Sequence, residues 1–269
     1  MNSLPWHLIY NYSKLASADL LSLSTSRDYD SNRIQNLLNQ KKILKDKDFN
    51  DIFCLDLISI AKVVYLYPYG KEIIPFPKQI GSLIYLEVLT ISADRINSLP
   101  DSIGNLLRLR KLHIYDGSLV NLPDSLTKLT NLETLSVVRN KLTSLPTDIG
   151  KLQKLYEIDV TQNSLIDLSD RLPGGDQRNM SILHLTNLET LNIANNLLTS
   201  LPFDIGKLIK LRELKFSHNR LTSLPKSLTQ LTDLRIFEYD GNRWDRWDRS
   251  DINIINQIDK IRYQNIIVK

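Results

Sequence analysis

The chain has 269 residues, of which 42% are hydrophobic and 24% charged, and its formal net charge is +4. The apolar fraction excludes a fully disordered chain, and no apolar run approaches the ~20 residues of a membrane-spanning helix. The single cysteine, Cys54, excludes an internal disulfide and a cysteine-rich metal cluster. The N-terminal sequence MNSLPWHLIYNYSK lacks the basic and apolar regions of a secretory signal, so we expect a cytoplasmic protein.

Residues 1–62 are the least regular part of the sequence. Within them, capping residues at 30–32 precede four apolar residues at helical spacing, namely Ile34, Leu37, Leu38 and Leu44. This spacing predicts a helix over residues 31–44, followed by a charged loop and an apolar stretch. We expect this segment to cover the exposed end of the structure that follows it.

From residue 63 onward the sequence repeats. Six of the ten prolines mark the period, each after a Leu or Phe: Pro77, Pro100, Pro123, Pro146, Pro202 and Pro225. Their spacing is 23 residues, except for one interval of 56 that equals one unit plus a second unit lengthened by ten. The units begin at Val63, Leu86, Leu109, Leu132, Leu155, Leu188, Leu211 and Leu234.

Each unit combines a strand pattern with a turn pattern. The unit from Leu132 reads LETLSVVRNKLTSLPTDIGKLQK, with apolar residues at positions 1, 4, 6, 11 and 14. Positions 3 to 7 alternate between two sides of a short strand, and the crossover in each unit predicts a parallel sheet. The Leu-Pro and Ile-Gly parts return along the outer side, where we expect proline to fix φ and glycine to relax a turn.

This pattern resembles the leucine-rich repeat family, in its 23-residue LxxLxLxxNxLxxLPxxIGxLxx subtype. The subtype occurs in short bacterial leucine-rich repeat proteins, in Ras-pathway scaffolds and in plant intracellular relatives. The resemblance implies an α/β fold: a curved, right-handed solenoid with a parallel concave sheet and an irregular or helical convex side. We expect an N-terminal helical cap over residues 1–62, repeats over 63–241 and a C-terminal cap over 242–269.

Three irregularities interrupt the period. Position 9, where this family carries an asparagine that satisfies loop backbone groups, is Gly117 in the third unit. The lengthened unit gains its ten extra residues near 173–182, in a Pro- and Gly-containing sequence that predicts a surface loop. This loop either lies near a binding surface or is an insertion without functional effect. Pro68 occupies a strand position without an N–H to donate, which indicates a sheet edge or a distorted unit.

The C-terminal sequence GNRWDRWDRSDI resembles the GNxW sequence that closes arrays of this subtype. We expect Ser250 to cap a short helix and RYQNIIVK to form a tail strand or strap. We expect this helix to carry Ile252, Ile255 and Ile258. Trp244 and Trp247 either cover the last leucines or form a cation–π or nucleic-acid contact.

No catalytic or metal-binding motif is present. The sequence has no nucleotide-binding glycine loop, no HExxH and no GxSxG, and its four histidines are scattered. Cys54-Leu55-Asp56 is similar to the Cys-x-Asp nucleophile of bacterial ubiquitin-ligase effectors, but there the motif belongs to a large domain after the repeats. We therefore expect no catalytic residue, no metal and no cofactor.

The concave face remains as the candidate binding surface, made by strand positions 3, 5, 7 and 8 of each unit. The candidate partner-binding residues are Tyr65, Tyr67, Tyr69, His113, Tyr115, Arg139, Glu157, Asp159, Glu213, Lys215 and His218. Aromatic residues flanked by mixed charge are typical of protein interfaces. The three N-terminal tyrosines have a second interpretation, in which the N-terminal cap packs on them.

The sequence therefore predicts a monomeric, non-catalytic scaffold or signalling adaptor that binds a protein or peptide. We expect no nucleic-acid partner, because the concave positions hold at least as many acids as bases and no repeated Lys or Arg column. We also expect no membrane partner. The alternatives are a host-directed bacterial effector exported without a classical signal and, less favoured, an enzyme whose turnover depends on Cys54 or His113.

Overall fold

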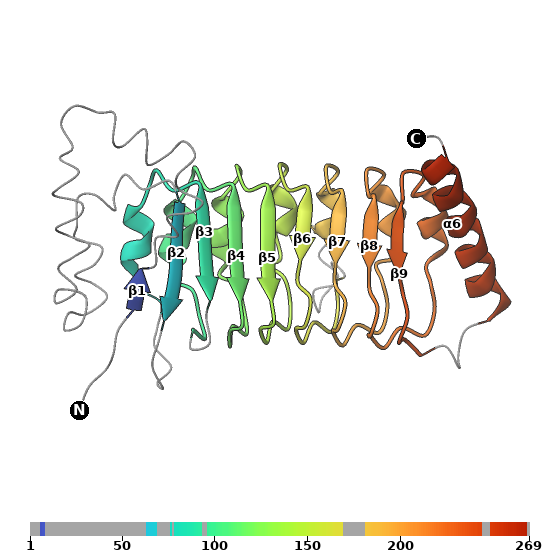
Figure 1. Ribbon diagram of the computed structural model, residues 1–269, viewed down its shortest axis with the longest axis horizontal. Helices are drawn as coiled ribbons and strands as arrows, with labels where there is room; N and C mark the ends of the chain where they lie inside the picture. Colours follow the sequence, from blue (N-terminus) through green and yellow to red (C-terminus); the bar gives the residue numbers. More distant parts are fainter. Residues whose placement is uncertain are drawn as a thin grey trace.

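The computed structural model describes residues 6–8, 63–68, 76, 78–92, 96–168, 181–243 and 248–267. Nine strands form one sheet in chain order (Figure 1). Their bounds are β1 Trp6–Leu8, β2 Val63–Pro68, β3 Val88–Ser92, β4 Lys111–Tyr115, β5 Thr134–Val138, β6 Glu157–Asp159, β7 Thr190–Asn192, β8 Glu213–Lys215 and β9 Ile236–Glu238. The fold is the expected leucine-rich solenoid, with β2 to β9 parallel.

Strand β1 was not predicted. It pairs antiparallel with β2, with Trp6 opposite Pro68, so β2 is an inner strand; of the two interpretations of Pro68, this excludes the sheet edge and leaves the distorted unit. The parallel register between β2 and β3 ends at Leu66–Ile91, before Pro68. The helix expected over residues 31–44 lies outside the described residues.

Alternation within each strand separates the core from the concave face. In β4, Leu112 and Ile114 are fully buried, whereas Lys111, His113 and Tyr115 lie on the other side of the strand. The leucine and isoleucine columns of successive units form one continuous hydrophobic core from Phe76 to the C-terminal helix. Each unit thus completes the core of its neighbour, as the repeat pattern requires.

Buried asparagines at position 9 join the units. The Asn163 side-chain oxygen accepts from Leu142 N at 3.0 Å, and its amide nitrogen donates to Val137 O at 2.6 Å and Val160 O at 3.0 Å. The same residue in other units bonds to the preceding unit in this way: Asn140, Asn196, Asn219 and Asn242. All five are buried, so each satisfies backbone groups that water cannot reach.

The convex side consists of short 3-10 helices (Figure 1). They are η1 Lys78–Ser82, η2 Asp101–Asn105, η3 Asp124–Lys128, η4 Ile149–Lys151, η5 Ile182–His184, η6 Ile205–Lys207 and η7 Lys226–Gln230. Prolines start several of them as expected: Pro100 has φ −76° and accepts from Ile103 N at 3.0 Å. Proline supplies the required φ, and its missing N–H costs nothing at this position.

The convex glycines have a different role from the predicted relaxation of a turn. None of Gly81, Gly104 and Gly206 has a positive φ. Each instead packs against the backbone of a serine in the next unit, and a Cβ at Gly81 would lie 2.5 Å from Ser102 O. Glycine is therefore required because neighbouring units approach closely at this point.

One helix, α6 Arg249–Ile267, follows the last repeat and includes most of the segment predicted as a tail strand. Asp248, not Ser250, provides the cap, because its carboxylate accepts from Ser250 N and Asp251 N. The helix buries Ile254 and Ile258 against the core, whereas Ile252 is 52% exposed.

Two side chains of α6 bond to backbone groups of the last repeat. Arg262 Nε donates to Arg235 O at 3.0 Å, and the buried Asp251 carboxylate accepts from Leu224 N at 2.7 Å. In the inner units the carbonyl equivalent to Arg235 O accepts N–H groups of the next unit; Arg212 O, for example, accepts from Arg235 N and Ile236 N. The Arg262 side chain therefore supplies to Arg235 O the hydrogen bond that the backbone of a further repeat would supply.

The lengthened unit resumes the regular pattern at Ser181. Ile182 is 2% exposed in the core, and Ser181 caps η5 by accepting from Leu183 N. Both residues therefore belong to the repeat, and the ten extra residues precede Ser181 rather than extending to 182. The remainder of that segment lies outside the described residues.

Candidate functional site

The concave face is the side of the sheet that carries strand positions 3, 5 and 7. On β4, the rings of His113 and Tyr115 stack with centroids 6.3 Å apart and planes inclined by 25°. Burial, and then the nearby positive charge of Lys111, hold the pKa of His113 below its ordinary value. The histidine therefore stays neutral at physiological pH and presents an aromatic surface.

Position 8 turns the chain at the end of each strand. Arg139 occupies this position after β5 with φ 52°, and its guanidinium pairs with the carboxylate of Asp116, the equivalent residue after β4. His218 has the same position after β8, with φ 55°. Arg139 thus lies at the edge of the His113–Tyr115 surface, with its guanidinium paired to one carboxylate.

Strands β6 and β8 carry the charged part of the face. Asp159 Oδ1 accepts from Thr161 N at 3.0 Å and from Thr161 Oγ1 at 2.6 Å, which fixes the orientation of its carboxylate. Lys215 Nζ lies 3.1 Å from Glu213 Oε2 and 3.9 Å from Glu238 Oε1. Glu157, at the start of β6, is part-buried and faces the same side.

The predicted site residues separate into two groups. The structure brings His113, Tyr115 and Arg139 together over β4 and β5, and Glu157, Asp159, Glu213 and Lys215 together over β6 to β8. Tyr65 and Tyr67 lie in β2, and Tyr65 is in register with Thr90 of β3. Tyr69 lies outside the described residues. Both interpretations of the three tyrosines, a partner-binding surface and a contact with the N-terminal cap, therefore stay predictions.

Some members of this surface were not among the predicted residues. Lys111, Asp116, Val138 and Glu238 take part in it, and each occupies an outward column or the turn column that the period already marks. Conversely, Thr134 and Ser136 point outward from β5 but are 3% and 9% exposed, because larger neighbouring side chains cover them. The position of a residue in the repeat thus predicts which side of the sheet its side chain faces. The size of the neighbouring side chains decides how much of it is exposed.

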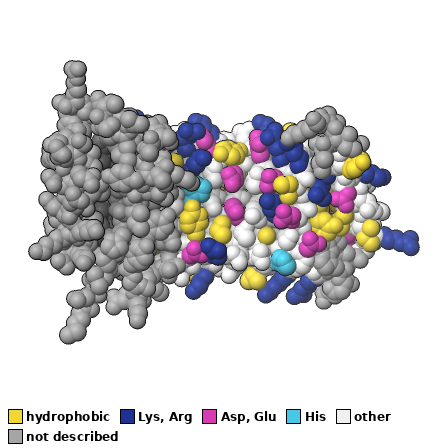
Figure 2. Space-filling view, in the orientation of Figure 1, with side chains coloured by type: hydrophobic (Ala, Val, Ile, Leu, Met, Phe, Trp, Pro, Cys, Tyr) yellow, Lys and Arg dark blue, Asp and Glu magenta, His cyan; other side chains and the backbone are white. Residues whose placement is uncertain are grey.

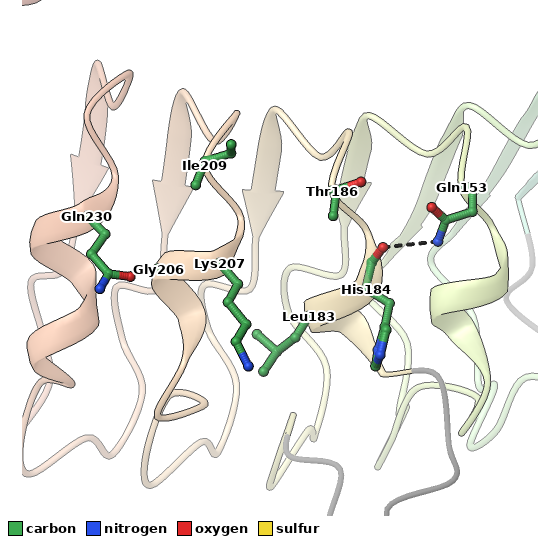
Figure 3. Close-up of a pocket in the computed structure, with 8 residues that line it drawn as sticks. All are labelled: Gln153, Leu183, His184, Thr186, Gly206, Lys207, Ile209 and Gln230. Atoms are coloured by element: carbon green, nitrogen blue, oxygen red, sulfur yellow. Dashed lines mark hydrogen bonds between the residues drawn. The ribbon is translucent and has the colours of Figure 1, made fainter.

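A shallow pocket of about 650 Å³ lies on the convex side, between η5 and η6 (Figure 3). Leu183 and Lys207 point into it, and Gln153 Nε2 donates to His184 O at 3.0 Å along its edge. Its other lining residues are Thr186, Gly206, Ile209 and Gln230. Sequence reasoning missed this pocket, and a leucine at the position where neighbouring units have glycine is the signal that marks it.

Two further observations concern the described part of the chain alone. No helix within it is long and apolar enough to cross a bilayer. Among the same residues, no three His, Cys, Asp or Glu side chains are grouped so that they can hold a metal ion.

Two family models match the sequence. The model described as leucine-rich repeat region matches residues 38–165, and the one described as leucine rich repeat matches residues 180–243. The chain belongs to the leucine-rich repeat family. The first match begins at residue 38, ahead of the first unit that the period predicts at Val63, and the two matches together contain β2 to β9.

Solved structures share the leucine-rich repeat fold. An internalin C2 of Listeria monocytogenes is 20% identical, with a TM-score of 0.54 over 70% of this chain and 73% of that protein. A TDR receptor is 24% identical, with a TM-score of 0.50 over 62% of this chain and 28% of that chain. A leucine-rich repeat protein of Leptospira interrogans is 25% identical, with a TM-score of 0.45 over 78% and 62%.

The leucine-rich repeat chain therefore spans about a quarter of the TDR receptor and less than two-thirds of the Leptospira protein. None of the curated proteins matches its sequence.

Proposed function

We propose that this leucine-rich repeat chain is a non-catalytic, cytoplasmic scaffold or signalling adaptor that binds a protein or peptide on its concave face. The observation that supports it is the part-exposed surface formed by His113, Tyr115, Val138 and Arg139. Tyrosine and arginine are typical anchors of protein interfaces, because tyrosine buries a large area with only two side-chain torsions and arginine offers several hydrogen-bond donors on a planar group. The sheet backbone holds these side chains rigidly, so little entropy is lost on binding.

The charge pattern supports a protein rather than a nucleic acid as the partner. A groove that binds phosphates presents Lys or Arg in repeated positions, because each neutralised phosphate adds affinity. On the described concave positions of β3 to β9, six carboxylates accompany three Lys or Arg residues, and two of these cations pair with acids, as Lys215 does with Glu213. Of the two residues that the enzyme alternative names, Cys54 lies outside the described residues and His113 lies on the concave face.

Affinity capture followed by mass spectrometry identifies the partner, and its affinity is then measured by calorimetry. Replacing Tyr115 and Arg139 with alanine should weaken binding by about 2 kcal/mol, roughly a 30-fold rise in Kd, if both are anchors. Asp148→Ala and Lys207→Ala on the convex side are the matched controls, since each also removes one side of an exposed ion pair.

The thermal midpoints of all four variants should stay close to that of the wild type. The opposite ranking, in which the convex variants abolish binding and the concave variants have no effect, would overturn the proposal. It would direct attention to the pocket between η5 and η6.

A further inference from the structure

The middle of the concave face contains a strip of uncharged residues on β7, between the acidic strand β6 and strand β8, which carries Glu213 and Lys215. Glu157 of β6, Thr190 of β7 and Glu213 of β8 are in register and form one row across the sheet. Strands lie about 4.8 Å apart, so the two glutamates start from backbones roughly 10 Å apart with Thr190 between them. In the next outward row, Asp159 of β6 and Asn192 of β7 are in register with Lys215 of β8.

The acidic groups around this strip exceed the cations available to them. Lys215 contacts Glu213 and Glu238. Within the described ranges, no Lys, Arg or His lies within ion-pair distance of Glu157 or Asp159. Thr161 orients Asp159 through Oδ1 without neutralising it. Two negative charges on β6 therefore have no counter-ion in the part of the chain that the structure describes.

The charge of this face is opposite to that of the whole chain. Strand positions 3, 5, 7 and 8 of the described units β3 to β9 carry six carboxylates and three Lys or Arg residues, whereas the chain has a formal charge of +4. Figure 2 shows Asp and Glu along the middle of the sheet, with groups of Lys and Arg toward its upper and lower margins. The carboxylates around the strip therefore give this part of the face a negative local potential, although the whole chain is positively charged.

We propose that the strip over β6 to β8 binds a Lys or Arg side chain of an extended segment of the partner protein. This inference rests on the proposed concave-face function and specifies the partner's chemistry. A cationic group over Thr190 would lie about 5 Å from the row positions of both Glu157 and Glu213, with Asp159 alongside. Thr190 and Asn192 are small enough to leave space for its stem and to accept hydrogen bonds.

The neighbouring aromatic surface indicates which second residue the partner segment should carry. Tyr115 and Val138 lie on β4 and β5, two to three strands or roughly 10–14 Å from the strip. An extended segment advances about 3.3 Å per residue. The partner should therefore carry an aromatic or large apolar residue three or four positions from its Lys or Arg.

The probe is a phage library of random dodecapeptides, selected on the full chain and on a Glu157→Gln/Asp159→Asn variant. These isosteric changes remove both charges, and the amide oxygen introduced at position 159 can still accept from Thr161. Selection on the wild type should enrich Lys or Arg three or four positions from an aromatic residue. A synthetic selected peptide should bind the variant at least ~10-fold more weakly, and its affinity for the wild type should fall as salt is raised.

Asp204→Asn on the convex side is the control, because it removes one part-exposed carboxylate, paired with Lys207, from the other side of the molecule. It should leave the peptide affinity unchanged. Peptides that lose binding to Tyr115→Ala but show no Lys or Arg enrichment, and bind the Glu157→Gln/Asp159→Asn variant normally, would overturn this inference and leave the proposed function standing. A selection that yields no peptide dependent on Tyr115 would overturn both.

Discussion

Six successive turns place a residue in the left-handed region of backbone space. Five are not glycine, with φ between 52° and 56°: Asp116, Arg139, Gln162, Asn195 and His218. This conformation costs about 1–2 kcal/mol for a residue with a Cβ. In four of the five turns a buried asparagine follows directly, and its hydrogen bonds to the preceding unit hold the turn in place.

Replacing Gln162 with glycine should therefore raise the free energy of unfolding by about 0.5–1 kcal/mol, because glycine has no Cβ to strain. Gln162 is exposed, so little packing is lost. The midpoint of a urea melt at constant slope measures the change. Thr186→Gly, at an exposed position where φ is negative, should instead lower stability, and a similar loss at Gln162 would show that the turn is unstrained.

His113 should make the stability of the fold sensitive to acid. Its folded-state pKa lies below the ordinary 6.5 because of burial and then Lys111, so the unfolded chain binds its proton first as the pH falls. The stabilisation from the neutral ring is present above the unfolded pKa and is lost as the pH falls through the folded pKa.

A His113→Gln variant should thus lose less stability than the wild type between about pH 7 and about pH 5 in urea melts. His184→Gln is the matched control, because His184 is exposed on the convex side and lies in no aromatic pair that the structure describes. Identical pH profiles for the wild type and the His113 variant would contradict the assignment.

At the scale of elements, the repeat period predicted the strands β3 to β9 and their parallel order. It succeeded because alternation between leucine and polar residues is enforced seven times by the same packing. The period could not predict the elements outside the repeats, because their contacts occur only once in the molecule. The period contains no information on β1, which precedes the first repeat and pairs antiparallel with β2. It also contains none on the C-terminal tail, whose sequence RYQNII has apolar residues that suit a strand as well as a helix.

The candidate site was predictable to a similar extent. The register fixes which side chains share a row, so Glu157, Asp159, Glu213 and Lys215 could be grouped from the sequence. The bond of Lys215 to Glu213 and the burial of Thr134 could not, because both depend on side-chain conformation and on the size of neighbours.

The burial of α6 gives a direct test of its helical register. Ile258 is fully buried against the last repeat, and Ile258→Ala should cost about 2–5 kcal/mol of unfolding free energy. Ile252, on the same helix but 52% exposed, should tolerate the same substitution within ~0.5 kcal/mol. Denaturant melts of the two variants compare the positions, and equal losses would show that the helix packs in a different register.

At the scale of the whole molecule, the lengthened unit is the one departure from a uniform period. Leu168 is buried before it and Ile182 is buried after it, so both flanks already have repeat geometry. Deleting residues 170–179 should restore a unit of 23 residues and leave the fold intact, because shortening a loop changes its closure entropy only slightly.

Circular dichroism and a cooperative melt close to the wild-type midpoint would bear this out. The deletion retains Ser181 and Ile182, which belong to the repeat. A variant that retains helical signal but melts without cooperativity would show that the removed residues contribute to the core.

The bond between Arg262 and Arg235 O has a consequence for how such a protein can grow. The carbonyl that Arg262 contacts is the same group that every inner unit presents to its successor. Duplicating an inner unit in the gene would therefore move the helix outward by one step and leave its junction chemically unchanged. Length can change during evolution through a single duplication, without simultaneous change at the end of the array.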